Sequence, residues 1–251
     1  MFLDKCEMKS SVEISVIIPI YNDRESLELF FQRLIKVLNK ITDSFELIFI
    51  DDGSIDNSMG ILRELKLTED RLKIIRFERN FGMHSAISAG FKYAKGEMVV
   101  MMDSDLQTDP EELPLLLQKI NEGNDIVSGW RRYRKDPFFS RYLPSFLLNL
   151  ILSLLIKKRI HDICCTFKIF KKEVVRDIIY FGNLLAFTPQ LKKYNYTEVK
   201  IDHRPRLFGK SKFSYHSLIK QAYIMLLYMI KSKFHIIDVI QPSYRIEEIY
   251  E

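Results

Sequence analysis

Apolar residues in the first half of the chain fall into short runs separated by longer stretches of mixed character. The short runs predict buried strands at residues 14–18, 45–50, 72–77, 98–102 and 125–128. The longer stretches have apolar residues three and four positions apart, which predicts helices at 25–38, 58–65 and 83–94. Strands that alternate with helices of this length indicate an α/β fold with a mostly parallel sheet flanked by helices.

The second half contains two long apolar segments with basic neighbours. Residues 138–156 are followed by Lys157, Lys158 and Arg159, and residues 218–230 are followed by Lys231. Each apolar stretch is shorter than the ~20 residues that span a bilayer. We expect amphipathic helices that lie in the membrane interface; a pair of ordinary core helices is the alternative, and the pattern alone leaves both open.

Two carboxylates stand directly after the apolar run at 98–102. Asp103 and Asp105 are two positions apart, so an extended backbone points both side chains the same way. Ligands of open α/β sheets bind beyond the carboxyl ends of the strands, and Mg²⁺ is commonly shared between one or two carboxylates and substrate phosphates. The pattern predicts a metal site, although a polar turn without a ligand would give the same residues.

The next residues predict the start of a helix. Asp109 is a good N-cap, Pro110 suits the first helical position, and Glu112 can close a capping box. The two carboxylates are therefore expected on a loop between a strand and a helix.

Polar segments follow three of the predicted strands, at residues 19–23, 51–54 and 103–107. Because neighbouring parallel strands end at one edge of a sheet, these segments are expected to meet in one crevice. Neither glycine-rich phosphate-binding motif is present. A nucleotide bound here would have its diphosphate neutralised by a metal instead.

Length and composition are those of an ordinary folded protein. The 251 residues are 47% hydrophobic and 28% charged, which suits one large domain. Cys6, Cys164 and Cys165 form no disulfide framework, which fits a reducing cytoplasmic compartment. Residues 1–11 are polar and mixed in charge, so no signal peptide is expected.

The net charge of +5 hides an uneven distribution along the chain. Residues 1–130 hold 15 Lys and Arg against 23 Asp and Glu, residues 131–233 hold 22 against 6, and residues 234–251 hold 1 against 4. The basic part predicts an anionic partner, either nucleic acid or an anionic membrane leaflet, unless its lysines are simply solvated. The same boundaries divide the chain into an acidic first part, a basic second part and a short C-terminal tail.

Four segments together resemble family 2 inverting glycosyltransferases with the GT-A fold: residues 16–22, 51–56, 79–82 and 103–107. Residues 203–206 (His-Arg-Pro-Arg) and 209–212 (Gly-Lys-Ser-Lys) are similar to the polyprenyl-phosphate glycosyltransferase branch of that family. The resemblance runs from about residue 14 to about residue 230, with the motifs in the family's order. It implies a nucleotide-sugar-binding GT-A core at residues 1–130, an acceptor-binding and membrane-interface part of the same domain at residues 131–233, and a C-terminal tail at residues 234–251.

This resemblance implies roles for individual residues. The nucleotide sugar would be bound by Pro19, Tyr21, Asp23, Ile50, Asp51, Asp103 and Ser104. Mg²⁺ or Mn²⁺ would be held by Asp103, Asp105 and Gln107, with Asp105 and Arg206 as the catalytic pair on the donor diphosphate. The acceptor phosphate would be bound by Arg131, Arg141, Ser145, Ser211 and Lys212. Arginine suits this task, because its fork matches phosphate oxygens with two hydrogen bonds.

The implied reaction is a single in-line displacement that inverts the anomeric carbon. Its partners would be a nucleotide-sugar donor and undecaprenyl or dolichyl phosphate, with the protein peripheral on the cytoplasmic side of the membrane or dependent on a membrane-spanning partner protein. Two alternatives remain: transfer to a glycan or protein, and a catalytically silent module that keeps the fold. Nucleic acid is not expected as a partner, since no recognition motif accompanies the basic residues.

Overall fold

The computed structural model describes residues 12–132, 143–180, 184–208, 223–231 and 243–251. Its strands are β1 (Ile14–Ile20), β2 (Phe45–Asp51), β3 (Leu72–Phe77), β4 (Met98–Met101), β5 (Ile126–Arg132), β6 (Lys168–Lys171), β7 (Tyr196–Asp202) and β8 (Ile246–Tyr250). Its helices are α1 (Arg24–Ile41), α2 (Ser58–Thr68), α3 (Met83–Tyr93), α4 (Leu113–Asn121), α5 (Leu143–Ile156), α6 (Lys172–Tyr180) and α7 (Leu184–Phe187), with the 3-10 helices η1 (Pro110–Glu112) and η3 (Thr188–Lys193). Residues 223–231 are also helical.

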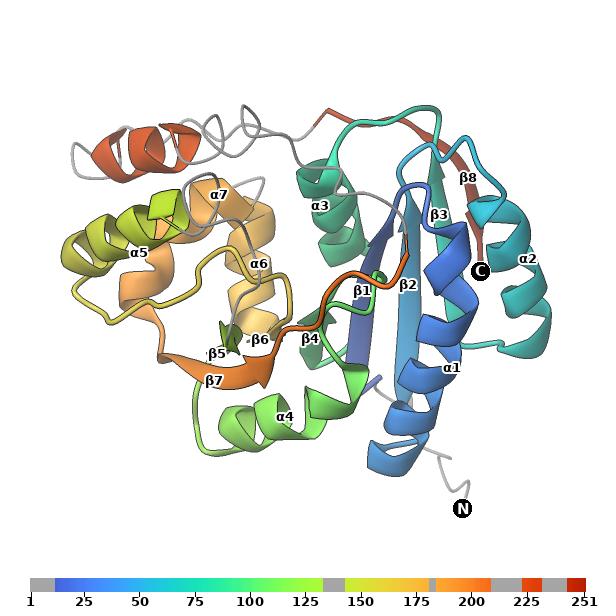
Figure 1. The fold of residues 1–251 in the computed structure, drawn as a ribbon, viewed down its shortest axis with the longest axis horizontal. Coiled ribbons are helices and arrows are strands. Elements are labelled where there is room, and N and C mark those ends of the chain that lie inside the picture. Colours follow the sequence, from blue (N-terminus) through green and yellow to red (C-terminus); the bar gives the residue numbers. More distant parts are fainter. Residues whose placement is uncertain (1–11, 133–142, 181–183, 209–222, 232–242) are drawn as a thin grey trace, which may run out of the picture.

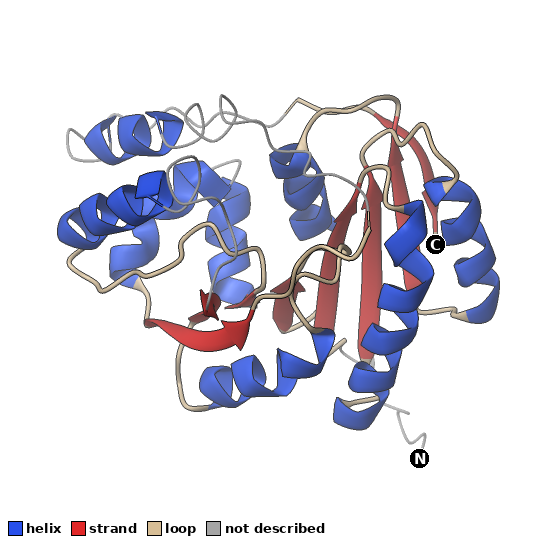
Figure 2. Cartoon of the chain, viewed as in Figure 1, coloured by secondary structure: helices blue, strands red, loops and turns tan. Residues whose placement is uncertain are grey.

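All the described strands join one sheet in the order β7-β5-β6-β4-β1-β2-β3-β8 (Figures 1 and 2). Four neighbouring pairs are parallel (β1–β2, β1–β4, β2–β3 and β5–β7), and β6 and β8 pair antiparallel with their neighbours. The prediction of a mostly parallel sheet flanked by helices is confirmed. The strands predicted at 45–50 and 72–77 match β2 and β3 closely.

The central strands are mostly apolar and almost fully buried because each of their two faces packs into a core. In β1, Val16 and Ile18 pack with α1, α2 and α4 on one face of the sheet. Ile17, between them, packs with α3 and α6 on the other face. Period-two alternation thus shares one continuous apolar run between two layers of helices.

The C-terminal residues extend the sheet. β8 pairs antiparallel with β3, and Arg63 of α2 donates hydrogen bonds to Glu248 and Tyr250. β5 runs across position 130, the first predicted boundary, and β8 lies inside the segment 234–251 predicted as a tail. The division into three parts stays a prediction.

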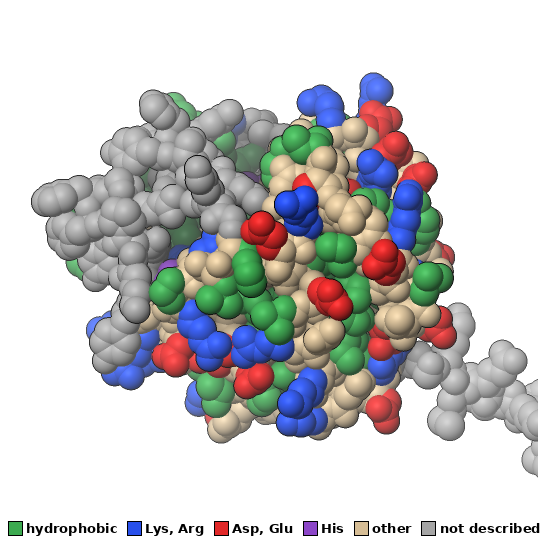
Figure 3. Space-filling view, turned by 45° about the vertical axis from the view of Figure 1, so that its right-hand side comes forward, with side chains coloured by type: hydrophobic (Ala, Val, Ile, Leu, Met, Phe, Trp, Pro, Cys, Tyr) green, Lys and Arg blue, Asp and Glu red, His purple; other side chains and the backbone are tan. Residues whose placement is uncertain are grey.

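The helix α5 buries one side and exposes an apolar other side. Leu148, Leu152 and Ile156 are buried in the core. The exposed large side chains of the same helix are all apolar: Phe146, Leu147, Leu150, Ile151, Leu154 and Leu155. Elsewhere, on the face seen in Figure 3, basic and acidic side chains are interspersed. α5 is therefore a core helix that is apolar on both sides rather than the amphipathic helix that was predicted. Contact of its outer side with a membrane stays a prediction.

The capping box predicted at Glu112 does not form. Asp109 caps η1 as expected, accepting a hydrogen bond from the backbone N of Glu111 at 3.1 Å. The Glu112 carboxylate instead accepts a hydrogen bond from the backbone N of Asp202 at 3.0 Å. Glu112 therefore connects the end of β7 to this turn, a contact between residues 90 positions apart.

Close packing of α3 against β1 and β2 gives a first prediction. A Cβ added at Gly90 of α3 would lie 2.3 Å from Ile17 Cγ2, so Gly90→Ala forces helix and sheet apart. We expect it to lower the free energy of unfolding by about 1–3 kcal/mol, measured by urea denaturation. Gly60→Ala is the control, because the Cβ there meets only the movable Asn57 side chain. An unchanged stability of Gly90→Ala would contradict the packing.

Candidate active site

Three adjacent parallel strands end at one edge of the sheet and carry most of the predicted donor-site residues. In the order β4-β1-β2, Pro19 lies in β1 opposite Ile50 of β2, and Ile20 lies opposite Asp51. β4 ends two residues before Asp103. The predicted convergence of three polar strand ends is confirmed.

The loop after β1 is tied to the other two strand ends by Asp23. Its Oδ2 accepts hydrogen bonds from the backbone N of Tyr21 at 3.2 Å and from Ser104 Oγ at 3.1 Å. Its backbone N donates to Ser58 Oγ at 3.0 Å. The structure thus brings together Tyr21, Asp23 and Ser104, as the sequence predicted.

Asp51 lies fully buried at the end of β2. Its Oδ1 accepts a hydrogen bond from the backbone N of Ser54 at 3.0 Å, whereas its Oδ2 has no hydrogen-bond partner among the described residues. Arg76 Nε lies 3.8 Å from that oxygen. Burial raises the pKa of Asp51. The free acceptor suits a ligand N–H or hydroxyl group.

Asp103 and Asp105 are close enough for their charges to interact. Asp103 Oδ2 accepts a hydrogen bond from Thr166 Oγ1 at 2.6 Å. Burial, and then the charge of Asp105, raise the pKa of Asp103 to about 6. Two carboxylates in this relation favour a cation between them and the ligand.

Asp105 is already paired with an arginine from a distant part of the chain. Arg206 Nη2 lies 2.6 Å from Asp105 Oδ2, while Asp105 Oδ1 accepts the backbone N–H of Gln107 at 3.0 Å. The two residues that the sequence predicted as the catalytic pair therefore touch. A guanidinium held in this position can also reach an anionic ligand beside the carboxylate.

Gln107 lies against a histidine that the sequence analysis left unassigned. Its Nε2 is 3.5 Å from His203 Nε2, and its backbone O accepts the N–H of Arg204 at 2.9 Å. The His-Arg-Pro-Arg motif contains His203 and marked this segment in the sequence. The position of His203 beside Gln107, however, depends on the pairing of β7 with β5. The described residues contain no group of three His, Cys, Asp or Glu side chains that could hold a metal alone. Two carboxylates and an amide fit a Mg²⁺-like ion that completes its coordination with phosphate oxygens and water.

Arg131 lies at the end of β5 and forms a buried ion pair. Its Nε and Nη2 donate to the two oxygens of Asp162 at 2.7 and 2.9 Å, and Asp162 is 1% exposed. The Asp162 charge raises the pKa of Arg131, against the effect of burial. The positive charge of Arg131 offsets part of the rise in the pKa of Asp103.

The remaining acceptor residues are only partly described. Ser145 lies in the first turn of α5. Arg141, Ser211 and Lys212 lie outside the described residues. Sequence reasoning missed Asp162 and Thr166, which reach Arg131 and Asp103 from the segment before β6.

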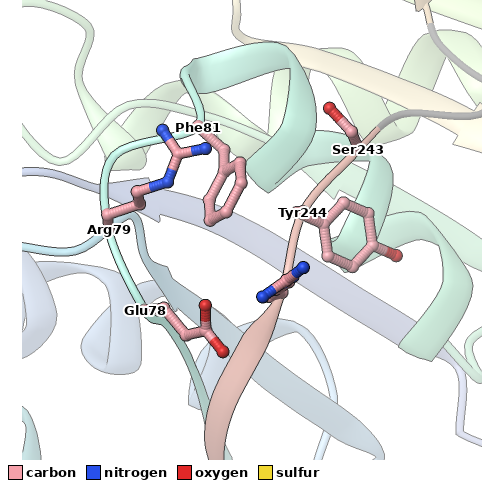
Figure 4. A pocket seen from close by; sticks show the side chains of 6 residues that line it. Glu78, Arg79, Phe81, Ser243 and Tyr244 are labelled. Atoms are coloured by element: carbon pink, nitrogen blue, oxygen red, sulfur yellow. The ribbon is translucent and has the colours of Figure 1, made fainter.

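A separate pocket of about 420 Å³ lies between the loop after β3 and the residues before β8 (Figure 4). It is lined by Glu78, Arg79, Phe81, Ser243, Tyr244 and Arg245. The Arg79 guanidinium carbon lies 4.4 Å from the centre of the Phe81 ring. The Asp52 carboxylate accepts the backbone N–H groups of Phe81 and Gly82 at 2.6 and 2.9 Å, which fixes this loop beside the end of β2.

Comparison with known proteins now identifies the family. The model of "Glycosyl transferase family 2" matches residues 15–179, more than half of the chain. The chain belongs to glycosyl transferase family 2. The match contains all three strand ends and both aspartates, and ends before Arg206.

Two curated relatives within this family carry the same name, undecaprenyl-phosphate 4-deoxy-4-formamido-L-arabinose transferase. The protein from Proteus mirabilis is 34% identical over 91% of this chain and 71% of its own length. The protein from Yersinia enterocolitica is 32% identical over 88% of this chain and 68% of its own length.

Solved structures show the same GT-A fold at low identity. Glucosyl-3-phosphoglycerate synthase from Mycobacterium tuberculosis, in complex with Mn²⁺ and UDP-glucose, has a TM-score of 0.64 and 17% identity, covering 95% of this chain and 87% of that one. Mannosyl-3-phosphoglycerate synthase from Rubrobacter xylanophilus has a TM-score of 0.66 and 12% identity, covering 92% and 78%.

The buried Arg131–Asp162 pair gives a second prediction. Asp162→Asn leaves the guanidinium without its counter-charge, so we expect the free energy of unfolding to fall by about 3 kcal/mol in urea denaturation. Lys119→Met is the matched control, since the Lys119–Glu122 pair is about 40% exposed on both sides and its loss should cost less than about 1 kcal/mol. Equal losses in the free energy of unfolding would show that the buried pair stabilises the fold no more than the exposed pair does.

Proposed function

We propose that this protein is an inverting glycosyltransferase that moves a sugar from a UDP- or GDP-sugar to a polyprenyl phosphate. The donor class is supported by the family and by the fold neighbour that binds UDP-glucose. The acceptor class is supported by the undecaprenyl-phosphate transferases, which match most of this chain.

The single observation that carries the proposal is the Asp105–Arg206 ion pair at the strand ends. It sets a carboxylate for a metal beside a guanidinium for a phosphate, which is the combination that a nucleoside diphosphate needs. Asp103 and Gln107 lie on the same loop and complete the proposed metal ligands. The proposed ion is Mg²⁺ or Mn²⁺, and the fold neighbour is bound to Mn²⁺.

The nucleoside side of the donor is assigned to the other two strand ends. Pro19, Tyr21 and Asp23 follow β1, and Ile50 and Asp51 close β2. Asp51 is the best placed for a specific contact, because its buried Oδ2 has no hydrogen-bond partner in the described part of the chain. Ser104 holds Asp23 in position through its hydroxyl group.

Chemistry at the anomeric carbon needs orientation more than proton transfer. A phosphate oxygen of the lipid is anionic near neutral pH, so it can attack the carbon without a general base. As the new C–O bond forms, the bond to the nucleoside diphosphate breaks on the opposite face, which inverts the configuration. A bound divalent ion would stabilise the charge that grows on the leaving diphosphate. The Arg206 guanidinium, which lies beside Asp105, would share in stabilising that charge.

The acceptor phosphate is assigned to the side of Arg131. The guanidinium of Arg131 is oriented by Asp162, and Ser145 at the start of α5 adds a hydroxyl group. Arg141, Ser211 and Lys212 belong to the same proposal on sequence grounds alone. A rigid arginine fork is suited to a phosphate monoester.

We assign the protein to the cytoplasmic face of the membrane as a peripheral enzyme. No described helix has the length and apolarity to span a bilayer. The exposed apolar side of α5 and the basic residues that follow it suit the interface of an anionic leaflet. Whether a membrane-spanning partner protein takes part is a separate question for pull-down from membranes.

Transfer itself gives the third prediction. Full-length protein, incubated with Mn²⁺, undecaprenyl phosphate and a panel of UDP- and GDP-sugars, should yield one glycosylated lipid phosphate by mass spectrometry. Asp105→Ala should lower the rate by roughly 100-fold or more, because the metal contributes several kcal/mol to the transition state. Asp70→Ala, at an exposed carboxylate, is the control and should keep the wild-type rate.

Two outcomes would count against the proposal. A product only with glycan or protein acceptors would favour the other enzymatic reading. No product with any donor, together with no nucleotide binding, would favour a catalytically silent module.

Membrane association gives the fourth prediction. Leu154 is 72% exposed on α5, so Leu154→Glu should weaken binding to phosphatidylglycerol vesicles by about 10-fold in flotation. Leu67→Glu is matched to it, since Leu67 is 87% exposed on α2, away from this face, and should bind as the wild type does. Equal binding by both variants would exclude α5 as the contact surface.

A further inference from the structure

The segment that carries Arg206 is attached at several points to residues 105–112, which include the proposed metal ligands Asp105 and Gln107. We refer to residues 202–206 as the Arg206 segment. Besides the Asp105–Arg206 pair, the backbone N of Arg204 donates to Gln107 O at 2.9 Å, and the backbone N of Asp202 donates to Glu112 at 3.0 Å. The Arg206 segment begins at the last residue of β7, so about 100 residues separate it in sequence from the loop that it contacts.

Asp109 lies at the centre of this attachment and makes more contacts than a helix cap needs. Arg33 Nη2 lies 2.6 and 2.7 Å from its two carboxylate oxygens, and Arg204 Nη2 lies 2.7 Å from Oδ2. The Asp109 side chain is 6% exposed. An N-cap requires one accepted hydrogen bond, which Glu111 supplies. Two arginines on one buried carboxylate therefore call for another explanation.

The two arginines differ in what they hold. Arg33 is 21% exposed and comes from α1, so it neutralises Asp109 within the helical layer of the core. The Arg204 side chain is 50% exposed and comes from the Arg206 segment. If Arg204 is removed, Asp109 keeps Arg33, so no buried charge is left unpaired. Loss of the Arg204 side chain would therefore remove one attachment of the Arg206 segment without leaving Asp109 uncompensated.

We propose that Arg204 is a positioning residue that, by pairing with Asp109, sets the place of Arg206 beside Asp105. This rests on the proposed function, in which Arg206 acts on the donor diphosphate. Arg204 is assigned no contact with the donor or the acceptor in that proposal. The Arg206 side chain pairs with Asp105, and the two contacts of Arg204 fix the backbone two residues before it.

Three variants of the full-length protein test the proposal as the fifth prediction. Arg204→Met should lower kcat by roughly 10- to 100-fold, because small displacements of an orienting group are costly, while Tm falls by less than about 3 °C. Arg204→Lys keeps the charge and should recover most of the lost kcat. Arg33→Met is the matched control. It should lower Tm more than Arg204→Met does, because Arg33 is less exposed and contacts both carboxylate oxygens of Asp109. It should keep kcat within about threefold, since Arg204 still holds the segment.

Amide hydrogen exchange tests the same inference without the reaction. Peptides that contain residues 202–206 should exchange roughly 10-fold faster in Arg204→Met than in wild type or Arg204→Lys. Faster exchange without detectable glycosyl transfer by the wild type would refute the proposed function and leave the attachment standing. Unchanged exchange and kcat in Arg204→Met, or equal losses of kcat in Arg204→Met and Arg33→Met, would overturn the positioning role.

Discussion

The candidate site depends on one electrostatic constraint. Several carboxylates lie close together at the ends of three parallel strands, where they are partly shielded from water. Like charges in such a place repel, and burial disfavours each of them. Every one has a counter-group from elsewhere in the chain. Arg76 approaches Asp51, Thr166 donates to Asp103, and Arg206 pairs with Asp105. A divalent metal ion would neutralise the negative charge that remains on these carboxylates and would at the same time bind a diphosphate.

The fold supplies these counter-groups through the second half of the sheet. β6 pairs with β4 and with β5, which brings the segment containing Asp162 and Thr166 beside the strand ends. β7 pairs with β5 and delivers the Arg206 segment to the same edge. Both the acidic first half and the basic second half therefore contribute side chains at these strand ends.

The sequence predicted the first half well because its signals are local. Apolar runs located β1 to β4, and polar residues after three of them located the strand ends that meet. Contacts between distant segments were out of reach: nothing local indicates that Asp162 pairs with Arg131, that His203 lies against Gln107, or that residues 246–250 pair with β3. The capping box at Glu112 was wrong for the same reason, since a long-range contact with Asp202 takes its carboxylate. Arg206 was found only through the resemblance to a family.

Isothermal titration calorimetry of UDP and GDP with the full-length protein tests the central claim most directly. It measures nucleotide binding at the strand-end carboxylates in the absence of acceptor lipid and membrane. We expect one of the two nucleotides to bind with one-to-one stoichiometry in the presence of Mn²⁺, and EDTA to weaken its binding by at least about 10-fold. Binding that EDTA leaves unchanged, or no binding of either nucleotide with Mn²⁺ present, would contradict a metal-dependent diphosphate site at Asp103, Asp105 and Gln107.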